Sequence, residues 1–274
     1  MAKLTEDERL FRKIEDKIKR AIFDYGLIND GDRILVGLSG GKDSLALVDL
    51  LGRRSKIYCP RFEVVVAHIV MTNIPYCSDR EYLRSCAEEH DLPFIVHETS
   101  FDPSTDTRKS PCFLCSWTRR KALFEIAKAH KCNKIALGHH FDDVIETILM
   151  GMFYGGKVET MMPKLHSQNF EGMELIRPMY LIKEDDIIAW RDYNQLNFIQ
   201  CACRFTENCV SCGGGRGSKR DEMKELIKEF RKQGDIIEKN IFRSVHNVNL
   251  RTIIGYHKDD MEYNFLDDYN ERGK

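Results

Sequence analysis

The amino-acid sequence predicts an α/β protein built on a doubly wound parallel sheet, with a cysteine-rich C-terminal segment. Short apolar runs alternate with helical segments along most of the chain, which is typical of strand–helix–strand units. The second run is apolar almost without interruption, as in strands that helices cover on both faces. With 274 residues, of which 42% are hydrophobic, the chain is long enough to bury one large core.

The expected elements follow in a regular order. An amphipathic helix at 5–25 carries apolar residues three or four positions apart, including Ile14 and Ile18. Strands and helices then alternate, with strands at 33–38, 63–70, 94–97 and 134–137, a helix from about Asp43, and helices at about 78–90, 115–130 and 219–233. In such a sheet, ligands bind beyond the carboxyl ends of the strands.

Composition divides the chain into three regions. They are an N-terminal helix at 1–25, the α/β domain at 26–200, and a Cys/Gly-rich segment with a C-terminal helical extension at 201–274. The stretch from His246 to Lys274 carries weak local signals, and we expect an arm or a partly disordered tail there.

The cellular setting follows from composition. No stretch approaches the ~18 apolar residues of a membrane span, and the charged N-terminal helix lacks the apolar region of a signal peptide. We therefore expect a cytoplasmic protein without a membrane partner. Ten cysteines in such a chain favour metal or redox chemistry over disulfides. The net charge of −1 gives no overall basic field, so a nucleic-acid surface has to be local.

The most informative segment is the glycine turn between the first strand and its helix. It consists of six consecutive residues, Ser39, Gly40, Gly41, Lys42, Asp43 and Ser44. The glycines let the backbone approach an anion without a Cβ atom in the way, and the helix start directs N–H groups and a positive dipole end at the same point. The spacing differs from that of the Walker A loop, which excludes the usual kinase or GTPase interpretation.

A second polar motif follows the strand at 134–137 and faces the same edge of the sheet. It begins with Gly138 and His139, and its adjacent Asp142 and Asp143 carboxylates can hold Mg²⁺ directly or through water. A structural interpretation stays open beside this one. In it, Asp142 caps the following helix and Glu146 satisfies a donor in the first turn.

Cysteine spacing provides the third signal. Cys112 and Cys115 form a CxxC pair on a helix that continues with three basic residues at 119–121, so two thiolates stand in a positively charged setting. The pair fits a redox dithiol, half of a zinc site or two ligands of an iron–sulfur cluster. Four further cysteines lie close together and can form a separate tetrahedral zinc site: Cys201, Cys203, Cys209 and Cys212.

Together, the SGGKDS loop, the CxxC pair and the GHHFDDVIET motif resemble the tRNA 2-thiocytidine synthetase (TtcA) family of the PP-loop ATP pyrophosphatase superfamily. The resemblance covers roughly residues 10–230 in order and spacing. The related tRNA lysidine synthetases share the loop and an acidic motif but lack the cysteine pair. The resemblance implies a PP-loop, adenine nucleotide α-hydrolase-like fold for 26–200. It also implies an ATP-dependent tRNA sulfurtransferase that adenylates a cytidine, at position 32 of the anticodon loop, and replaces its C2 oxygen with sulfur.

The same resemblance implies a [4Fe-4S] cluster on three cysteines. Two ligands fall on Cys112 and Cys115. The third falls on Cys201, with Cys203 as the alternative, because the proline and the spacing of the family's PCxxC segment are altered here. Three thiolates leave one iron open to hold hydrosulfide near the activated carbon. A persulfide on a cysteine of the CxxC pair is the other sulfur chemistry that fits.

The resemblance also assigns residues to the nucleotide. ATP is bound by all six loop residues together with His68, Gly138, His139 and Asp143. Mg²⁺ falls on Asp43 and Asp142, and the catalytic residues are Lys42, Asp43, Asp142, Cys112 and Cys115. The implied partners are tRNA, a sulfur donor such as a cysteine desulfurase or free sulfide, and a second copy of the chain in a homodimer.

RNA contacts are expected from local groups. Basic residues flank the two cysteine regions: Arg119, Arg120, Lys121, Arg204, Arg216, Lys219, Arg220 and Lys224. Trp117 and Tyr154 are candidates for stacking on a base, although aromatic residues more often pack in a core. Two other functions fit the same residues. One is a divergent PP-loop ATP-binding zinc protein, and the other is a sulfur transferase for a small molecule or another tRNA position.

Overall fold

The computed structural model describes residues 5–57, 59–73, 79–102, 104, 111–196, 219–267 and 269. The side chains of residues 111 and 112 lie outside this description, as do all of the cysteines at 201–212. None of the helices in the described part combines the length and apolar composition needed to cross a membrane.

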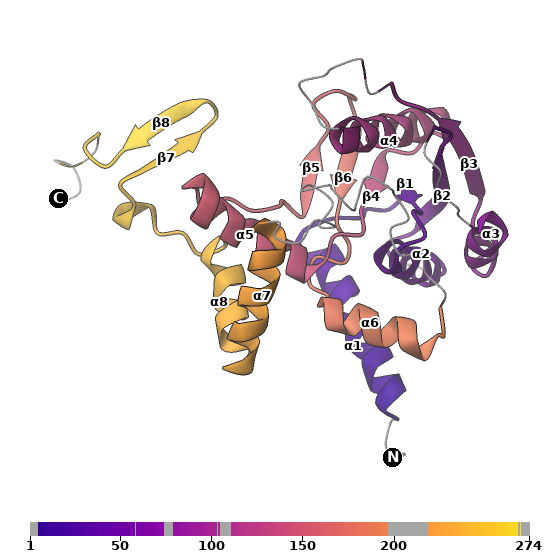
Figure 1. The fold of residues 1–274 in the computed structure, drawn as a ribbon, viewed down its shortest axis with the longest axis horizontal. Helices are drawn as coiled ribbons and strands as arrows, with labels where there is room; N and C mark the ends of the chain where they lie inside the picture. Colours follow the sequence, from indigo (N-terminus) through magenta and orange to yellow (C-terminus); the bar gives the residue numbers. More distant parts are fainter. Residues whose placement is uncertain are drawn as a thin grey trace.

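A six-stranded sheet forms the centre of the protein (Figure 1). Its strands are β1 (Asp32–Gly37), β2 (Phe62–Met71), β3 (Phe94–Thr99), β4 (Lys134–Ala136), β5 (Lys164–His166) and β6 (Glu174–Ile176), in the spatial order β3-β2-β1-β4-β6-β5. All neighbours are parallel except the edge pair β5 and β6. The predicted fold class is therefore confirmed.

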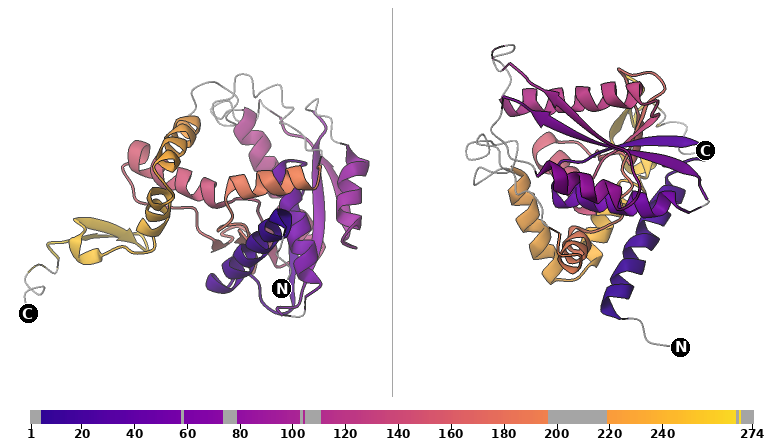
Figure 2. Two further views of the ribbon diagram at one scale, coloured as in Figure 1. Left: turned by 90° about the horizontal axis from the view of Figure 1, so that it is seen from below. Right: turned by 90° about the vertical axis from the view of Figure 1, so that its right-hand side faces the viewer.

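Helices cover both faces of the sheet, as Figure 2 shows. The described helices are α1 (Glu6–Asp24), α2 (Lys42–Ser55), α3 (Arg80–Glu88), α4 (Pro111–Ala129), α5 (Phe141–Gly155), α6 (Glu184–Tyr193), α7 (Lys219–Lys232) and α8 (Ile236–Ser244), with a short 3₁₀ turn at Leu250–Thr252. The helix around the CxxC pair begins earlier than expected. Proline fits the first helical position well, because that position needs no N–H donor.

Alternate residues of the central strands serve two separate cores. Ile34 and Val36 of β1 pack with residues of α1, α2, α3 and α6 on one face. Leu35 points the opposite way and packs with Val65 of β2 and with residues of α4. This period of two explains why the centres of β1 and β2 are mostly apolar, since both of their faces are buried there. Among the described helices, α4, which carries the CxxC pair, is the one that packs on this second face of the sheet.

The C-terminal part contains the elements that the sequence predicted least well. Helices α7 and α8 pack on α5 through a small apolar cluster that includes Met223 and Ile227. Beyond them, β7 (Gly255–Lys258) and β8 (Met261–Asn264) form an antiparallel hairpin that extends away from the sheet (Figures 1 and 2). The expected C-terminal arm therefore contains regular structure. The sequence predicted α7 but not α6, α8 or the hairpin.

Candidate active site

The glycine turn after β1 forms a backbone cradle at the carboxyl edge of the sheet. Gly40 has φ +85°, a left-handed conformation that glycine adopts without steric cost. The two serine hydroxyls lie 3.1 Å apart, and Ser44 Oγ also donates to the Gly41 carbonyl oxygen at 2.9 Å. Because the hydroxyls hold the turn closed, the N–H groups at the start of α2 stay directed at one point, as an anion site requires.

Lys42, the first residue of α2, is held between two carboxylates. Its Nζ lies 2.9 Å from Asp43 Oδ1 and 2.9 Å from Glu184 Oε1 at the start of α6. Burial alone would lower the pKa of Lys42, but the carboxylates of Asp43 and Glu184 outweigh it and raise that pKa above the ordinary value. The ammonium is therefore charged at neutral pH and is available to stabilise negative charge on a phosphate.

The end of β4 approaches the loop closely. A Cβ atom on Gly138 would lie 3.3 Å from the carbonyl group of Asp43, so glycine allows the two backbones to meet. His140 follows, with 4% of its surface exposed. Its imidazole nitrogens lie 3.8 Å from Asp43, 3.8 Å from Asp142 and 3.5 Å from Asp143. The structure therefore brings the three expected carboxylates together around one imidazole.

His139 is neutral at physiological pH. Burial lowers its pKa to about 4 against the opposing charge of Asp143, and the cations of Arg177 and Arg220 lower it further. Its Nδ1 is buried and has no hydrogen-bond partner among the described residues. A neutral imidazole with a free nitrogen can accept a hydrogen bond from a ligand or donate one to it.

Asp142 has contacts that differ from those expected of a simple metal ligand. It is 3% exposed, its Oδ1 pairs with the guanidinium of Arg231, and its Oδ2 accepts the Glu184 N–H at 2.7 Å. Arg231 also donates to Glu238 Oε2 at 2.7 Å. Asp142 thus joins α5, α6 and α7, and it caps α6 rather than its own helix. Asp43, with a third of its side chain exposed, is the more accessible carboxylate for Mg²⁺.

The cap of α5 involves the neighbouring aspartate. His140 is the N-cap residue, and Asp143, at the third helical position, accepts the His140 N–H at 3.0 Å, so the expected N-cap role of Asp142 is wrong. Arg220 of α7 donates to Glu146 at 2.7 Å and lies 3.3 Å from Asp143. Burial raises the pKa of Glu146 despite this partner. Arg220, expected to face RNA, is therefore used within the protein.

His68 of β2 contacts the backbone just before the PP-loop. It is completely buried, and its Nδ1 lies 2.7 Å from the carbonyl oxygen of Leu38, the residue before the loop. Burial lowers the pKa of His68, so the neutral ring donates its Nδ1–H to this carbonyl. We expected His68 to contact ATP. Because the ring has no exposed surface, that expectation is corrected to a positioning role.

Helix α4 connects the CxxC pair to the loop. Arg119 and Leu123 of α4 line a recess of about 90 Å³ together with Ser39 of the loop and Ile69 of β2. The packing is close, since a Cβ atom on Gly37 would lie 3.2 Å from Leu123. The seven steps along the helix from Cys112 to Arg119 correspond to roughly 10 Å. The pair therefore starts about two turns from this recess.

The expected cluster ligands are only partly within the described structure. Cys115 is half-buried and packs against the core under α4. Cys112 lies on the same helix turn, but its side chain is outside the description, and Cys201 and Cys203 are outside it entirely. Among the described residues, no group of three or more His, Cys, Asp or Glu side chains is arranged to hold a metal ion.

The two aromatic candidates lie on the surface. Trp117 is 56% exposed, with Lys121 Nζ 5.7 Å from its ring centre. Tyr154 is 42% exposed, but Lys219 covers its ring at 4.3 Å and its hydroxyl donates to Glu222. Neither residue packs in the core, contrary to the structural interpretation.

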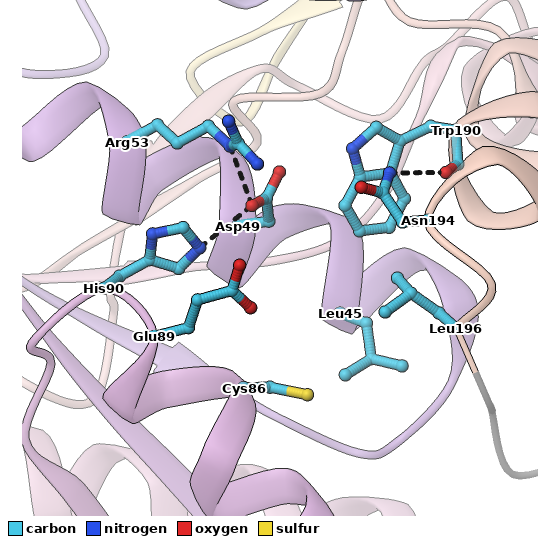
Figure 3. Close-up of a pocket in the computed structure, with 9 residues that line it drawn as sticks. All are labelled: Leu45, Asp49, Arg53, Cys86, Glu89, His90, Trp190, Asn194 and Leu196. Atoms are coloured by element: carbon cyan, nitrogen blue, oxygen red, sulfur yellow. Dashed lines mark hydrogen bonds and ion pairs between the residues drawn. The ribbon is translucent and has the colours of Figure 1, made fainter.

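A separate pocket lies between α2, α3 and α6 (Figure 3). Its volume is about 40 Å³, and Asp49 accepts a hydrogen bond from Arg53 at 2.8 Å and lies 2.9 Å from His90 Nε2. His90 packs on Gly52, where a Cβ atom would lie 2.6 Å from the ring. The pocket is too small for a nucleotide, and Asp49 Oδ1 is already engaged by Arg53 and His90.

Three site residues were missed by the sequence analysis. Glu184 pairs with Lys42, Arg231 pairs with Asp142, and Arg177 lies at the end of β6. Only the first had a local signal, because Glu184 opens an acidic first turn that is typical of a helix start. The arginines depend on tertiary contacts with residues far away in the sequence.

The fold and the glycine cradle define a PP-loop protein, and the family model of the PP-loop domain matches residues 10–204. A tRNA-cytidine(32) 2-sulfurtransferase of Geotalea daltonii is 36% identical over 260 residues, covering 90% of this chain and 96% of its own. One of Burkholderia multivorans is 36% identical over 250 residues, covering 89% and 71%. The chain belongs to the same family as these enzymes, which confirms the resemblance seen in its motifs.

A solved structure agrees with the fold. The U34-tRNA thiolase NcsA from Methanococcus maripaludis, determined with its [4Fe-4S] cluster, superimposes with a TM-score of 0.68 at 22% identity. The match covers 91% of this chain and 84% of NcsA.

Proposed function

We propose that this protein is an ATP-dependent tRNA thiolase that modifies a cytidine at position 32. Its relatives in the family carry that name, and its own residues supply the two parts that the reaction needs. One observation from the structure carries most weight. Helix α4, which begins with the cysteine pair, lines the same recess as Ser39 of the PP-loop. Activation of the base and delivery of sulfur can therefore take place at one edge of the sheet.

The first half of the reaction is adenylation. The cytidine C2 oxygen attacks the α-phosphorus of ATP, and pyrophosphate leaves. The cradle around Gly40 holds the departing phosphates, and Lys42 stabilises their growing charge while Glu184 fixes its position. Mg²⁺ bound at Asp43 would screen further charge. In this arrangement Asp142 acts mainly as the group that keeps His140 and α6 in place.

In the second half, a sulfur nucleophile attacks C2 and AMP leaves with the former C2 oxygen. The donor set fits a [4Fe-4S] cluster on Cys112, Cys115 and Cys201, with Cys203 as the alternative third ligand. Cys115 is a half-buried cysteine on a helix that continues with basic residues. When bound, a cluster with three protein ligands would supply an open iron for sulfide. The chain's own contribution is to carry both cysteines of the pair on the helix that lines the recess, about two turns (Cys112) and one turn (Cys115) before Arg119.

The sulfur source and the oligomeric state belong to the same proposal. A cysteine desulfurase or free sulfide would deliver sulfur, and the enzyme would act as a homodimer. The zinc-protein alternative is favoured by one observation, the four closely spaced cysteines at 201–212.

Metal analysis after anaerobic purification tests the proposal. We expect about four irons and four sulfides per chain, with a loss of iron in Cys112→Ala, in Cys115→Ala and in one of Cys201→Ala and Cys203→Ala. Cys132→Ala is the matched control, because this buried cysteine lies in the core and away from the pair. Zinc without iron, unaffected by Cys112→Ala, would support the zinc-protein alternative instead.

Product analysis completes the test. Wild-type protein with ATP and sulfide should convert cytidine to 2-thiocytidine in unmodified tRNA, as measured by nucleoside chromatography. Iron loading without any thiolated nucleoside would contradict the proposed reaction.

A further inference from the structure

One buried cation at the carboxyl edge, Arg177, has no carboxylate partner among the residues that the structure describes. Arg177 follows β6 directly and is 8% exposed. Its side chain donates one hydrogen bond, from Nη1 to the carbonyl oxygen of Met162, and its Nε is buried without a partner among the described residues. No carboxylate in the described part of the chain lies within ion-pair distance of its guanidinium. A buried charge without a counter-ion is costly, and such groups are usually paired.

The surroundings of Arg177 add to this imbalance. Burial lowers the pKa of the Arg177 guanidinium, and the positive charge of Arg120 on α4 lowers it as well. Tyr180 and Asp143 act in the opposite direction, but Asp143 is already engaged by Arg220 and by the His140 N–H. His139, whose buried Nδ1 has no partner in the described structure, lies close enough to Arg177 for its pKa to be lowered by that charge. In the described structure, the one carboxylate that acts on both Arg177 and His139 is that of Asp143, and it is already paired with Arg220.

Arg177 lies on the opposite side of the PP-loop from the recess that Ser39 and α4 line. The recess beside the loop is lined by β1, β2 and α4. Arg177 lies at the end of β6, on the far side of β4, which is two strands or roughly 10 Å from β1. If ATP occupies the cradle beside this recess, the side that holds Arg177 is left for the second substrate.

We propose that Arg177, Arg120 and His139 form a phosphate subsite that binds a backbone phosphate of the RNA next to the target nucleotide. The inference rests on the proposed function. Phosphate is the anion that a guanidinium recognises best, through paired N–H donors. A phosphate of ATP has the same chemistry, so the experiment separates the two sources.

The test measures binding of unmodified tRNA and of a non-hydrolysable ATP analogue to the full-length holoprotein across a range of salt concentrations. In Arg177→Gln, the Kd for tRNA should rise about 10-fold or more. The slope of log K against log salt should become shallower by about 0.7–0.9, as for the loss of one phosphate contact. Affinity for the ATP analogue should not change. Arg177→Lys keeps the charge and should keep the slope.

The matched control is Arg54→Gln. Arg54 is also 8% exposed, donates to one backbone carbonyl, that of Cys59, and has a buried Nε without a partner in the described structure, but it lies at the opposite end of α2 from the loop. Its replacement should affect thermal stability as much as Arg177→Gln and should leave the salt slope for tRNA unchanged. If Arg177→Gln does not fold, the exposed Arg120→Gln takes its place and should show the same loss of slope.

The outcomes are distinct. Unchanged tRNA affinity and salt slope in both Arg177→Gln and Arg120→Gln, in a preparation whose wild type binds and thiolates tRNA, would overturn the inference and leave the proposed function intact. Weaker binding of the ATP analogue with unchanged tRNA binding would assign the subsite to the nucleotide and overturn the RNA assignment. A wild-type protein without salt-dependent tRNA binding would contradict the proposed function itself.

Discussion

Replacement of Asp142 by asparagine tests whether this carboxylate binds Mg²⁺ or stabilises the fold. In the structure Asp142 is 3% exposed and pairs with Arg231, which is itself shared with Glu238. Asparagine can still accept the Glu184 N–H, so Asp142→Asn removes the charge and leaves the cap of α6 in place. The variant therefore removes the buried ion pair between Asp142 and Arg231 and leaves the hydrogen bond to the Glu184 N–H in place.

The expected loss follows from burial. Breaking a buried pair by neutralising one partner typically costs about 3–5 kcal/mol, against a total stability of about 5–15 kcal/mol. At about 2–4 °C per kcal/mol, this corresponds to a fall in Tm of roughly 6–20 °C. Arg231→Gln should cause a loss of similar size. The double variant should lose less than the sum, because the second change removes a charge that the first left unpaired.

Thermal unfolding followed by circular dichroism gives the Tm, and calorimetry gives the affinity for an ATP analogue with and without Mg²⁺. If Asp142 is primarily structural, stability falls and the Mg²⁺ dependence of binding persists in the folded protein. A Tm close to that of the wild type, together with loss of the Mg²⁺ dependence of binding, would refute the reasoning and would identify Asp142 as a Mg²⁺ ligand.

Three further outcomes follow from the site and its support. Lys42→Ala should reduce tRNA-dependent pyrophosphate release by roughly 100-fold or more, with a near-normal melting curve; retained release would remove Lys42 from its assigned role. Because the pKa of His139 is about 4 when folded and 6.5 as the ordinary value, stability should be complete above pH 6.5 and decline as the pH falls towards 4, by up to about 3 kcal/mol. His139→Gln should flatten that part of the pH profile in urea unfolding, and an unchanged profile would contradict the neutral assignment. Gly52→Ala should cost about 1–3 kcal/mol, since a Cβ atom would lie 2.6 Å from the His90 ring, whereas Gly155→Ala, with open space around it, should be close to neutral in the same unfolding assay.

Local signals account for what the sequence predicted correctly. Strands β1 and β2 are long apolar runs, and the PP-loop between β1 and α2 is specified by glycine and serine at adjacent positions. Strands β5 and β6 have three residues each, too short for a period to be visible. Helix α6 has a weakly amphipathic sequence with acidic residues in its first turn, and the hairpin at the C-terminus buries little of its surface.

In the candidate site, too, the residues in local motifs were predicted and their partners from distant elements were not. The loop, His139 and the carboxylates of Asp142 and Asp143 are close together in the sequence or follow neighbouring strands, so topology alone brings them to one edge. The partners that set their charge come from distant elements. Arg231 and Glu184 have no motif of their own, and only the packing of α6 against α2 and of α7 against α5 assigns them. The role of His68 was predicted wrongly because sequence does not show which way a strand residue points.

The contacts of α7 determine when the site becomes complete during synthesis of the chain. Arg220 and Arg231 supply the positive charges for Glu146 and Asp142, which are almost fully buried at the start of α5. A chain that ended before residue 219 would contain the PP-loop and the acidic motif but would lack the two arginines that neutralise these carboxylates. During synthesis, the nucleotide edge therefore reaches its final charge balance only after α7 has emerged from the ribosome. The composition boundary near residue 201 marks a change in sequence, and the nucleotide-binding unit extends across it.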